Sequence, residues 1–168
     1  MTHLRLKGLL LAVHPTTYGF GWVLFEGPQS PVDWGLAGKG RRDNAQLMHR
    51  FEQLLNKYEP RVLVLEEFES AVSKRASRIQ RLCRAMIHLA AERGLETPVY
   101  SRQSVRACFA SVGATTRHEI ARCVAQHIDV FRWMLPKERK PWMSESPRQS
   151  LFDAAALAIT YFAVTGAP

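Results

Sequence analysis

The sequence is poor in cysteine and has no long apolar run. Cys83, Cys108 and Cys123 are its only cysteines, and none has the close spacing of a metal-binding or redox motif. We therefore expect reduced core cysteines in a cytoplasmic protein rather than disulfides. No stretch reaches the roughly 18 apolar residues of a membrane span. The apolar stretch before His14 and Pro15 has no small-residue cleavage site, so we expect neither a membrane partner nor a signal peptide.

Acidic residues are also scarce. The chain has 15 Asp and Glu against 23 Lys and Arg, which gives a formal net charge of +8. A basic excess favours a polyanionic partner, because Lys and Arg displace counterions from phosphates. Nucleic acid is favoured over an anionic membrane surface, which is the other polyanion that this charge could bind. No long Pro, Gly or Ser tract divides the 168 residues, so we predict a single domain over residues 1–168.

The order of apolar patterns predicts an α/β fold. Strands are predicted over 9–13, 19–25, 32–37, 61–65 and 98–100, and helices over 44–58, 74–93, 101–110, 116–128 and 146–164. The first three strands are close enough to form an antiparallel meander. The run over 61–65 is apolar throughout, which is typical of a central strand that is covered on both faces. The polar, Trp-containing segment over 129–144 is predicted to be a loop.

Three polar side chains should meet at one end of this sheet. In the predicted order, the ends of the first and fourth strands lie side by side, which brings His14 near Glu66, and the last helix returns Asp153 to the same place. Glu66 could instead be a solvated strand end, and Asp153 a helix-start acid favoured by the dipole. However, Asp153 stands in an otherwise apolar run, where a carboxylate is costly unless it is paired or liganded. Clustered carboxylates are the ligands that Mg²⁺ prefers in phosphodiester-cleaving sites.

Three stretches of the chain together resemble a known family. They are YSRQSVRACFASVG over 100–113 followed by TRHEI over 116–120, LEEF over 65–68, and DAAALAI over 153–159. These stretches resemble the RuvC family of Holliday-junction resolvases, within the ribonuclease-H-like superfamily. The resemblance extends from the first strand to the last helix. It implies a ribonuclease-H-like mixed five-stranded sheet with flanking helices, and metal-dependent, structure-selective cleavage of branched DNA.

The resemblance also implies roles for individual residues. His14, Glu66 and Asp153 would be the metal-binding and catalytic residues, Arg106 and Arg117 would lie next to the scissile phosphate, and Phe68 would touch unpaired DNA. The family has an Asp-Pro-Gly-Ser type turn where this chain has HPTT over 14–17. His14 therefore stands in place of the first catalytic Asp, and among divalent ions it favours Mn²⁺ over Mg²⁺.

The last helix shows a second departure from the family. The family carries two acids there about one turn apart, whereas this chain has Asp153 with Ser150 in the preceding turn. Glu67 and Glu145 are both candidates to supply the missing carboxylate. These two departures keep open a second function, that of a nucleic-acid-binding relative that has lost nuclease activity. An actin-like sugar kinase or ATPase is a weaker third hypothesis. Such proteins need two lobes around the nucleotide, and 168 residues provide only one.

A basic arc on the helix predicted over 74–93 is the candidate DNA surface. Its members are Lys74, Arg75, Arg78, Arg81 and Arg84. The alternative is a solvated helix face without a partner. In the RuvC family the matching helix lies close to the dimer interface, so the resemblance also implies a homodimer.

Overall fold

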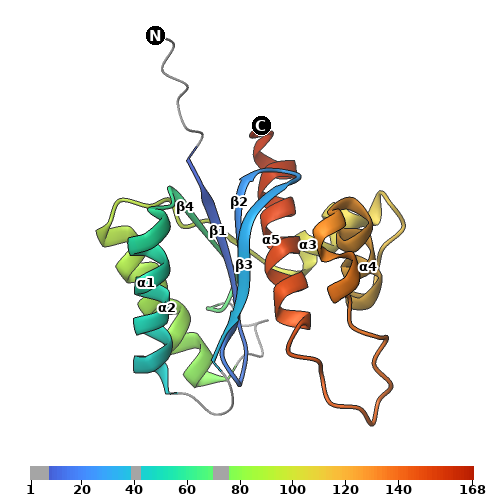
Figure 1. Cartoon of the computed structure of the whole chain (residues 1–168), viewed down its shortest axis with the longest axis horizontal. Helices are drawn as coiled ribbons and strands as arrows, with labels where there is room; N and C mark the ends of the chain where they lie inside the picture. Colours follow the sequence, from blue (N-terminus) through green and yellow to red (C-terminus); the bar gives the residue numbers. More distant parts are fainter. Residues whose placement is uncertain (1–7, 39–42, 70–75) are drawn as a thin grey trace.

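The computed structural model describes residues 8–38, 43–69 and 76–168, and its centre is a mixed five-stranded sheet (Figure 1). The strands are β1 (Leu10–Pro15), β2 (Phe20–Gly27), β3 (Ser30–Ala37), β4 (Val62–Glu66) and β5 (Val99–Tyr100), in the spatial order β3-β2-β1-β4-β5. The first three form an antiparallel meander, and β4 pairs in parallel with β1 and with β5. The predicted mixed sheet and meander are confirmed.

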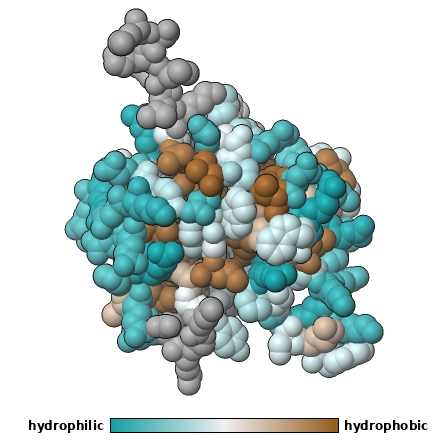
Figure 2. Space-filling model, viewed as in Figure 1, coloured by the Kyte–Doolittle hydropathy of each residue, from teal (hydrophilic) through white to brown (hydrophobic). Residues whose placement is uncertain are grey.

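Helices cover both faces of the sheet. One face carries α1 (Asn44–Tyr58) and α2 (Ser77–Glu92); the other carries α3 (Arg102–Ala110), α4 (Arg117–His127) and α5 (Gln149–Thr165). Figure 1 shows the two groups on opposite sides, and Figure 2 shows the hydrophilic outer surface over α1 and α2 as teal at its left. Within the described part of the chain, no helix is both long and apolar enough to span a membrane.

Three element boundaries differ from the predicted ones. β1 continues through His14, so this residue lies within the strand rather than in the turn after it. The α1 helix is capped by Asp43, whose side chain accepts a hydrogen bond from the backbone N–H of Gln46, and not by Asn44. The segment predicted as a loop begins with a short 3-10 helix, η1 (Asp129–Met134), because Phe131 is buried and draws this stretch onto the core.

The two faces of the sheet form separate cores, because side chains alternate along each strand. In β1, Leu10 and Ala12 belong to the core under α3, α4 and α5, whereas Leu11 and Val13 belong to the core under α1 and α2. β4 alternates in the same way, so both central strands are buried on both faces, as its apolar run predicts. The next residue on the α5 side of β1 is His14.

Candidate functional site

His14 and Glu66 project from the same face of the sheet on neighbouring strands. His14 follows Ala12 at strand spacing and Glu66 follows Val64, and these two apolar residues are partners in the parallel pairing of β1 with β4. The same register, continued by two residues, places His14 beside Glu66. Both side chains are buried, with 5% and 9% exposure of the residue, at the end of the sheet that faces the start of α5.

Asp153 reaches this place because α5 lies directly on β2. Gly21, which is the partner of His14 in the β1–β2 register, has no side chain where α5 crosses. A Cβ atom at Gly21 would be 2.4 Å from the backbone carbonyl carbon of Ser150. This close approach brings the first turn of α5 over the sheet, and Asp153 follows one turn later above His14.

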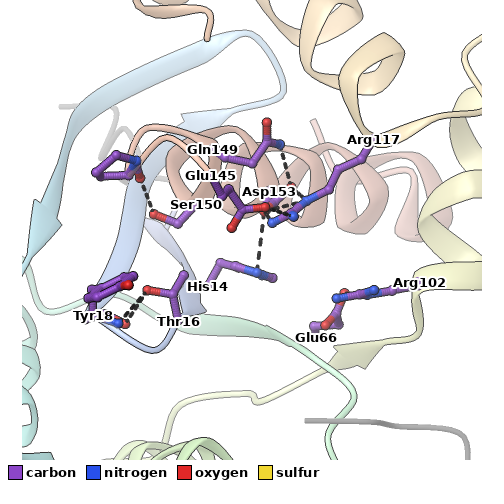
Figure 3. A network of polar contacts seen from close by, with 12 residues as sticks. His14, Thr16, Tyr18, Glu66, Arg102, Arg117, Glu145, Gln149, Ser150 and Asp153 are labelled. Carbon is purple, nitrogen blue, oxygen red and sulfur yellow. Dashed lines mark hydrogen bonds and ion pairs between the residues drawn. The ribbon is translucent and has the colours of Figure 1, made fainter. Parts of the chain in front are cut away.

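The Asp153 carboxylate is the centre of a polar network (Figure 3). Its Oδ2 atom lies 3.5 Å from Nε2 of His14, and its Oδ1 atom accepts a hydrogen bond of 3.0 Å from the Gln149 side-chain amide. The Arg117 guanidinium binds both carboxylate oxygens, with its Nε atom 3.1 Å from each. Arg117 also contacts Glu145, so of the two acids proposed as substitutes it is Glu145 that joins the network.

Arginines from two helix starts complete the site. Ser101 caps α3 and Thr116 caps α4, each accepting a backbone N–H from three residues further on, so Arg102 and Arg117 are the first residues of their helices. Arg102 Nε lies 3.3 Å from Glu66 Oε1. A small cavity of about 70 Å³ is lined by His14, Glu66, Arg102, Arg106, Arg117 and Asp153 together with apolar residues of α3, α4 and α5.

The ion pair between Asp153 and Arg117 keeps both side chains charged. Burial opposes ionisation of Asp153, but the neighbouring His14 and Arg117 outweigh it, so the pKa of Asp153 lies below its ordinary value. Burial also lowers the pKa of Arg117, yet its hydrogen bonds and charge interactions with Asp153 and Glu145 raise it above the ordinary value overall. Asp153 is therefore an anion and Arg117 a cation across the physiological pH range.

The donor set does not fit a pair of Mg²⁺ ions. Among the residues that the structure describes, no three His, Cys, Asp or Glu side chains are grouped so that they could hold a metal ion. Each carboxylate is engaged by an arginine, Glu66 by Arg102 and Asp153 by Arg117, and His14 contributes a neutral nitrogen where Mg²⁺ prefers an anionic oxygen. A two-metal site needs several carboxylates free to bridge the ions.

The predicted site residues separate into two groups. His14, Glu66, Arg106, Arg117 and Asp153 all line the one cavity. Phe68 does not: it is 5% exposed and packs in the core under α1 and α2, so the predicted contact of Phe68 with DNA is not supported by its position. The backbone N–H of Glu67 still donates to the carbonyl of Tyr100, and the ring of Phe68 fills the apolar core.

The predicted basic arc is only partly free surface. Arg78 is half-buried and donates to the backbone carbonyl of Thr17, and Arg84 pairs with Glu69 at 2.9 Å. Arg81 is exposed on α2. Lys74 and Arg75 lie outside the described residues.

The sequence analysis missed two members of the site, Arg102 and Gln149. A signal for Arg102 was present, because it precedes Arg106 by four residues and the two therefore share one helix face. Gln149 stands in the same relation to Asp153, one turn earlier in α5. Both signals become specific only when the helix starts are known.

Comparisons with known proteins identify the fold. No protein-family model matches the sequence, and no curated protein matches it. Solved structures do match. RuvC from Thermus thermophilus, in complex with a Holliday junction substrate, is 17% identical with a TM-score of 0.68 over 95% of this chain and 98% of that chain. The yeast mitochondrial Holliday junction resolvase Ydc2 is 14% identical with a TM-score of 0.60, over 95% and 81%.

The structure of a viral resolvase is also similar to this chain. The fowlpox virus resolvase, in complex with substrate Holliday junction DNA, is 10% identical with a TM-score of 0.57 over 92% of this chain and 99% of that chain. The chain therefore has the ribonuclease-H-like fold of the RuvC-like resolvases over nearly its whole length, as the resemblance of its motifs implies.

Proposed function

We propose that this chain is an endonuclease that acts on branched DNA of the Holliday-junction type. The observation that carries the proposal is the convergence of His14, Glu66, Asp153 and three arginines, from five different elements, on one cavity. The fold is shared with three resolvases, and two of these are complexes with junction DNA. The net charge of +8 supports a polyanionic partner.

The arginines are the phosphate-binding part of this proposal. Arg102 and Arg117 begin their helices at the cavity, where the backbone N–H groups of a helix start also favour an anion. Arg106 is exposed one turn after Arg102. A phosphodiester held there places its developing negative charge among cations, which is the interaction that strengthens in the transition state.

His14 and Glu66 are the groups that can accept a proton from an attacking water. They lie side by side at the floor of the cavity, and Asp153 holds the His14 imidazole from the α5 side. Because the donors do not fit a pair of Mg²⁺ ions, we assign no step to a metal ion. Dependence on a divalent metal ion, with Mn²⁺ favoured over Mg²⁺ by the imidazole, stays a prediction.

We further infer that the chain acts as a homodimer in the cytoplasm, with residues 1–168 as one functional unit. The support for a dimer is the resemblance of α2 to the helix near the dimer interface of the RuvC family. The support for the cytoplasm is a set of three free cysteines, of which Cys83 is buried in the core.

A cleavage assay on a labelled four-way junction tests the proposal. A linear duplex of the same sequence is the control substrate, and each is incubated with Mg²⁺, with Mn²⁺ and with a chelator. We expect cuts in the junction and not in the duplex. Tight junction binding without cuts under every condition would contradict the nuclease and support a binding protein with the same fold.

A further inference from the structure

Two tryptophans on the segment between α4 and α5 are exposed. Trp133 and Trp142 are 72% and 78% exposed, more than any other large hydrophobic side chain of the described residues. The segment projects as the orange loop at the lower right of Figure 1 before the chain enters α5. An exposed indole loses the stabilisation that its burial would bring, so two on one segment make it a candidate binding surface.

Trp133 is exposed because its neighbours in η1 are anchored in the core. On either side of it in η1, Phe131 and Met134 are buried. The Phe131 ring packs edge-on against Trp34 at 5.1 Å and against Phe152 at 6.1 Å between centroids. With its neighbours fixed in the core, the short helix holds the Trp133 indole outward.

Each exposed indole is accompanied by a cation. The Arg148 guanidinium lies 5.8 Å from the centroid of Trp133, and the Lys140 ammonium lies 5.4 Å from that of Trp142. The segment carries five basic residues against three acidic ones, and two of these acids, Asp129 and Glu145, already pair with arginines. Aromatic rings among cations are the arrangement by which proteins stack on bases while they hold the phosphate backbone.

The same segment is joined to the candidate site. Glu145 contacts Arg117, and Gln149, the first residue after the segment, donates to Asp153. The C-terminal end of the indole-bearing segment therefore borders the residues that line the cavity. Phe68, the aromatic expected to touch unpaired bases, is buried.

We propose that Trp133 and Trp142 form a stacking platform for unpaired bases of the branched DNA. This inference rests on the proposed function, which it deepens by naming the substrate feature that the segment binds. The alternative occupant of the indoles, a second copy of this chain, is disfavoured because it would bring two basic segments together. The bases of a strand complement both the rings and the charge.

Binding measurements on tryptophan variants test the platform. Trp133→Ala and Trp142→Ala are compared with the wild type by fluorescence anisotropy on a labelled single-stranded oligonucleotide, a four-way junction with an unpaired centre, and a linear duplex. Val164→Ala, at the far end of α5 and 66% exposed in the wild type, is the matched control. We expect each tryptophan variant to bind the single strand and the junction about 5- to 150-fold more weakly, the range for loss of one stacked base.

Further readouts separate stacking from other effects. Trp133→Phe and Trp142→Phe should retain most of the affinity, because a phenyl ring still stacks. The slope of affinity against salt should not change in any variant, because no charge is removed. Equal affinities of the Ala variants and the wild type would overturn the inference. So would a loss confined to self-association, measured by sedimentation, since the platform would then be an interface between copies.

The outcomes also distinguish the inference from the function on which it rests. If the wild type binds single strands and junctions through the indoles but does not cut junctions, the platform is supported and the proposed nuclease activity is contradicted. If the wild type cuts junctions and the tryptophan variants bind and cut equally well, the stacking platform is contradicted and the proposed nuclease is not. If the wild type binds none of the three nucleic acids, both fail.

Discussion

The imidazole of His14 and the carboxylate of Asp153 lie 3.5 Å apart, although the two residues come from opposite ends of the chain. The contact exists because α5 packs on the sheet directly over the end of β1. Arg117 binds the same carboxylate from α4, so Asp153 links three elements at the floor of the cavity. Removing its charge should therefore affect chemistry, DNA binding and stability in different ways.

Asp153→Asn should abolish junction cleavage. The amide cannot hold His14 as the carboxylate does, so the proton acceptor loses its orientation. DNA binding should stay equal or become tighter, because one negative charge beside the phosphate is removed. Cleavage and binding are measured on the same labelled junction, with Glu92→Gln, which removes an exposed acid of α2, as control. Wild-type cleavage by Asp153→Asn would exclude Asp153 from the reaction.

The same variant should reveal how the Asp153 ion pairs contribute to stability with pH. Because its pKa is lower in the folded chain than the roughly 3.9 of an unfolded Asp, this carboxylate contributes stability that is present above about pH 4. That contribution is lost as the pH falls through the folded pKa. The difference in free energy of unfolding between wild type and Asp153→Asn, measured by urea denaturation, should be constant near neutral pH and shrink below about pH 4. A difference that does not vary with pH would contradict the assignment.

Gly21→Ala tests how the fold positions the site. The new Cβ atom would meet the Ser150 backbone at 2.4 Å, and backbone atoms cannot turn aside as a flexible side chain can. We expect a loss of about 1–3 kcal/mol in the free energy of unfolding, the range for overpacking, together with loss of cleavage as α5 shifts. Gly27→Ala is the control in the same strand, because its nearest heavy atom is 3.9 Å away. Equal stability of the two variants would show that α5 does not need this close approach.

Much of this arrangement could be predicted from the sequence because it follows from periodicity. Apolar runs fix the strands, and the two-residue alternation along β1 and β4 then places His14 and Glu66 on one face. Asp153 could be predicted because a carboxylate in an apolar helix needs a partner. Each of these inferences needs only the position of a residue along its strand or helix, and not the contacts made by the tip of its side chain.

The residues that could not be predicted depend on long-range packing. The pairing of Arg117 with Asp153 joins two helices and that of Arg102 with Glu66 joins a helix to a strand, in both cases through a long, flexible side chain. The sequence predicts a loop around Trp133 and the family resemblance suggests a DNA contact for Phe68, but neither shows how far each ring is exposed, which is 72% for Trp133 and 5% for Phe68. Only the packing of their neighbours decides which aromatic ring is buried.

The basic arc on α2 should contribute unequally to DNA binding. Arg81 is exposed, whereas Arg78 holds the turn after β1 through Thr17. Arg81→Gln should therefore reduce the slope of log affinity against log salt concentration by about 0.9 if it contacts one phosphate. Arg61→Gln, at the opposite end of β4 from Glu66, removes the same charge and should leave the slope unchanged. Equal slopes for Arg81→Gln and the wild type would mean that this face is only solvated.

His14→Asp is the most informative change, because it introduces the carboxylate that the resemblance to the RuvC family implies for this position. A third carboxylate beside Glu66 and Asp153 adds repulsion, so the variant should unfold at lower temperature without metal. Mg²⁺ should then raise its melting temperature, since an ion that binds only the folded state stabilises it. His49→Asp, which changes an exposed histidine of α1, should show no such response.

Cleavage by the His14 variants separates the two functions of the site. If wild-type cleavage depends on Mn²⁺ and is lost in His14→Ala, the imidazole is a working ligand, as its softer nitrogen predicts. If the wild type does not cut the junction whichever metal ion is added, Mg²⁺-dependent cutting appears only in His14→Asp, and both bind the junction equally, His14 marks a retired active site. Binding of branched DNA would then be the function of the chain, because the arginines of the cavity remain in place when the first carboxylate is absent.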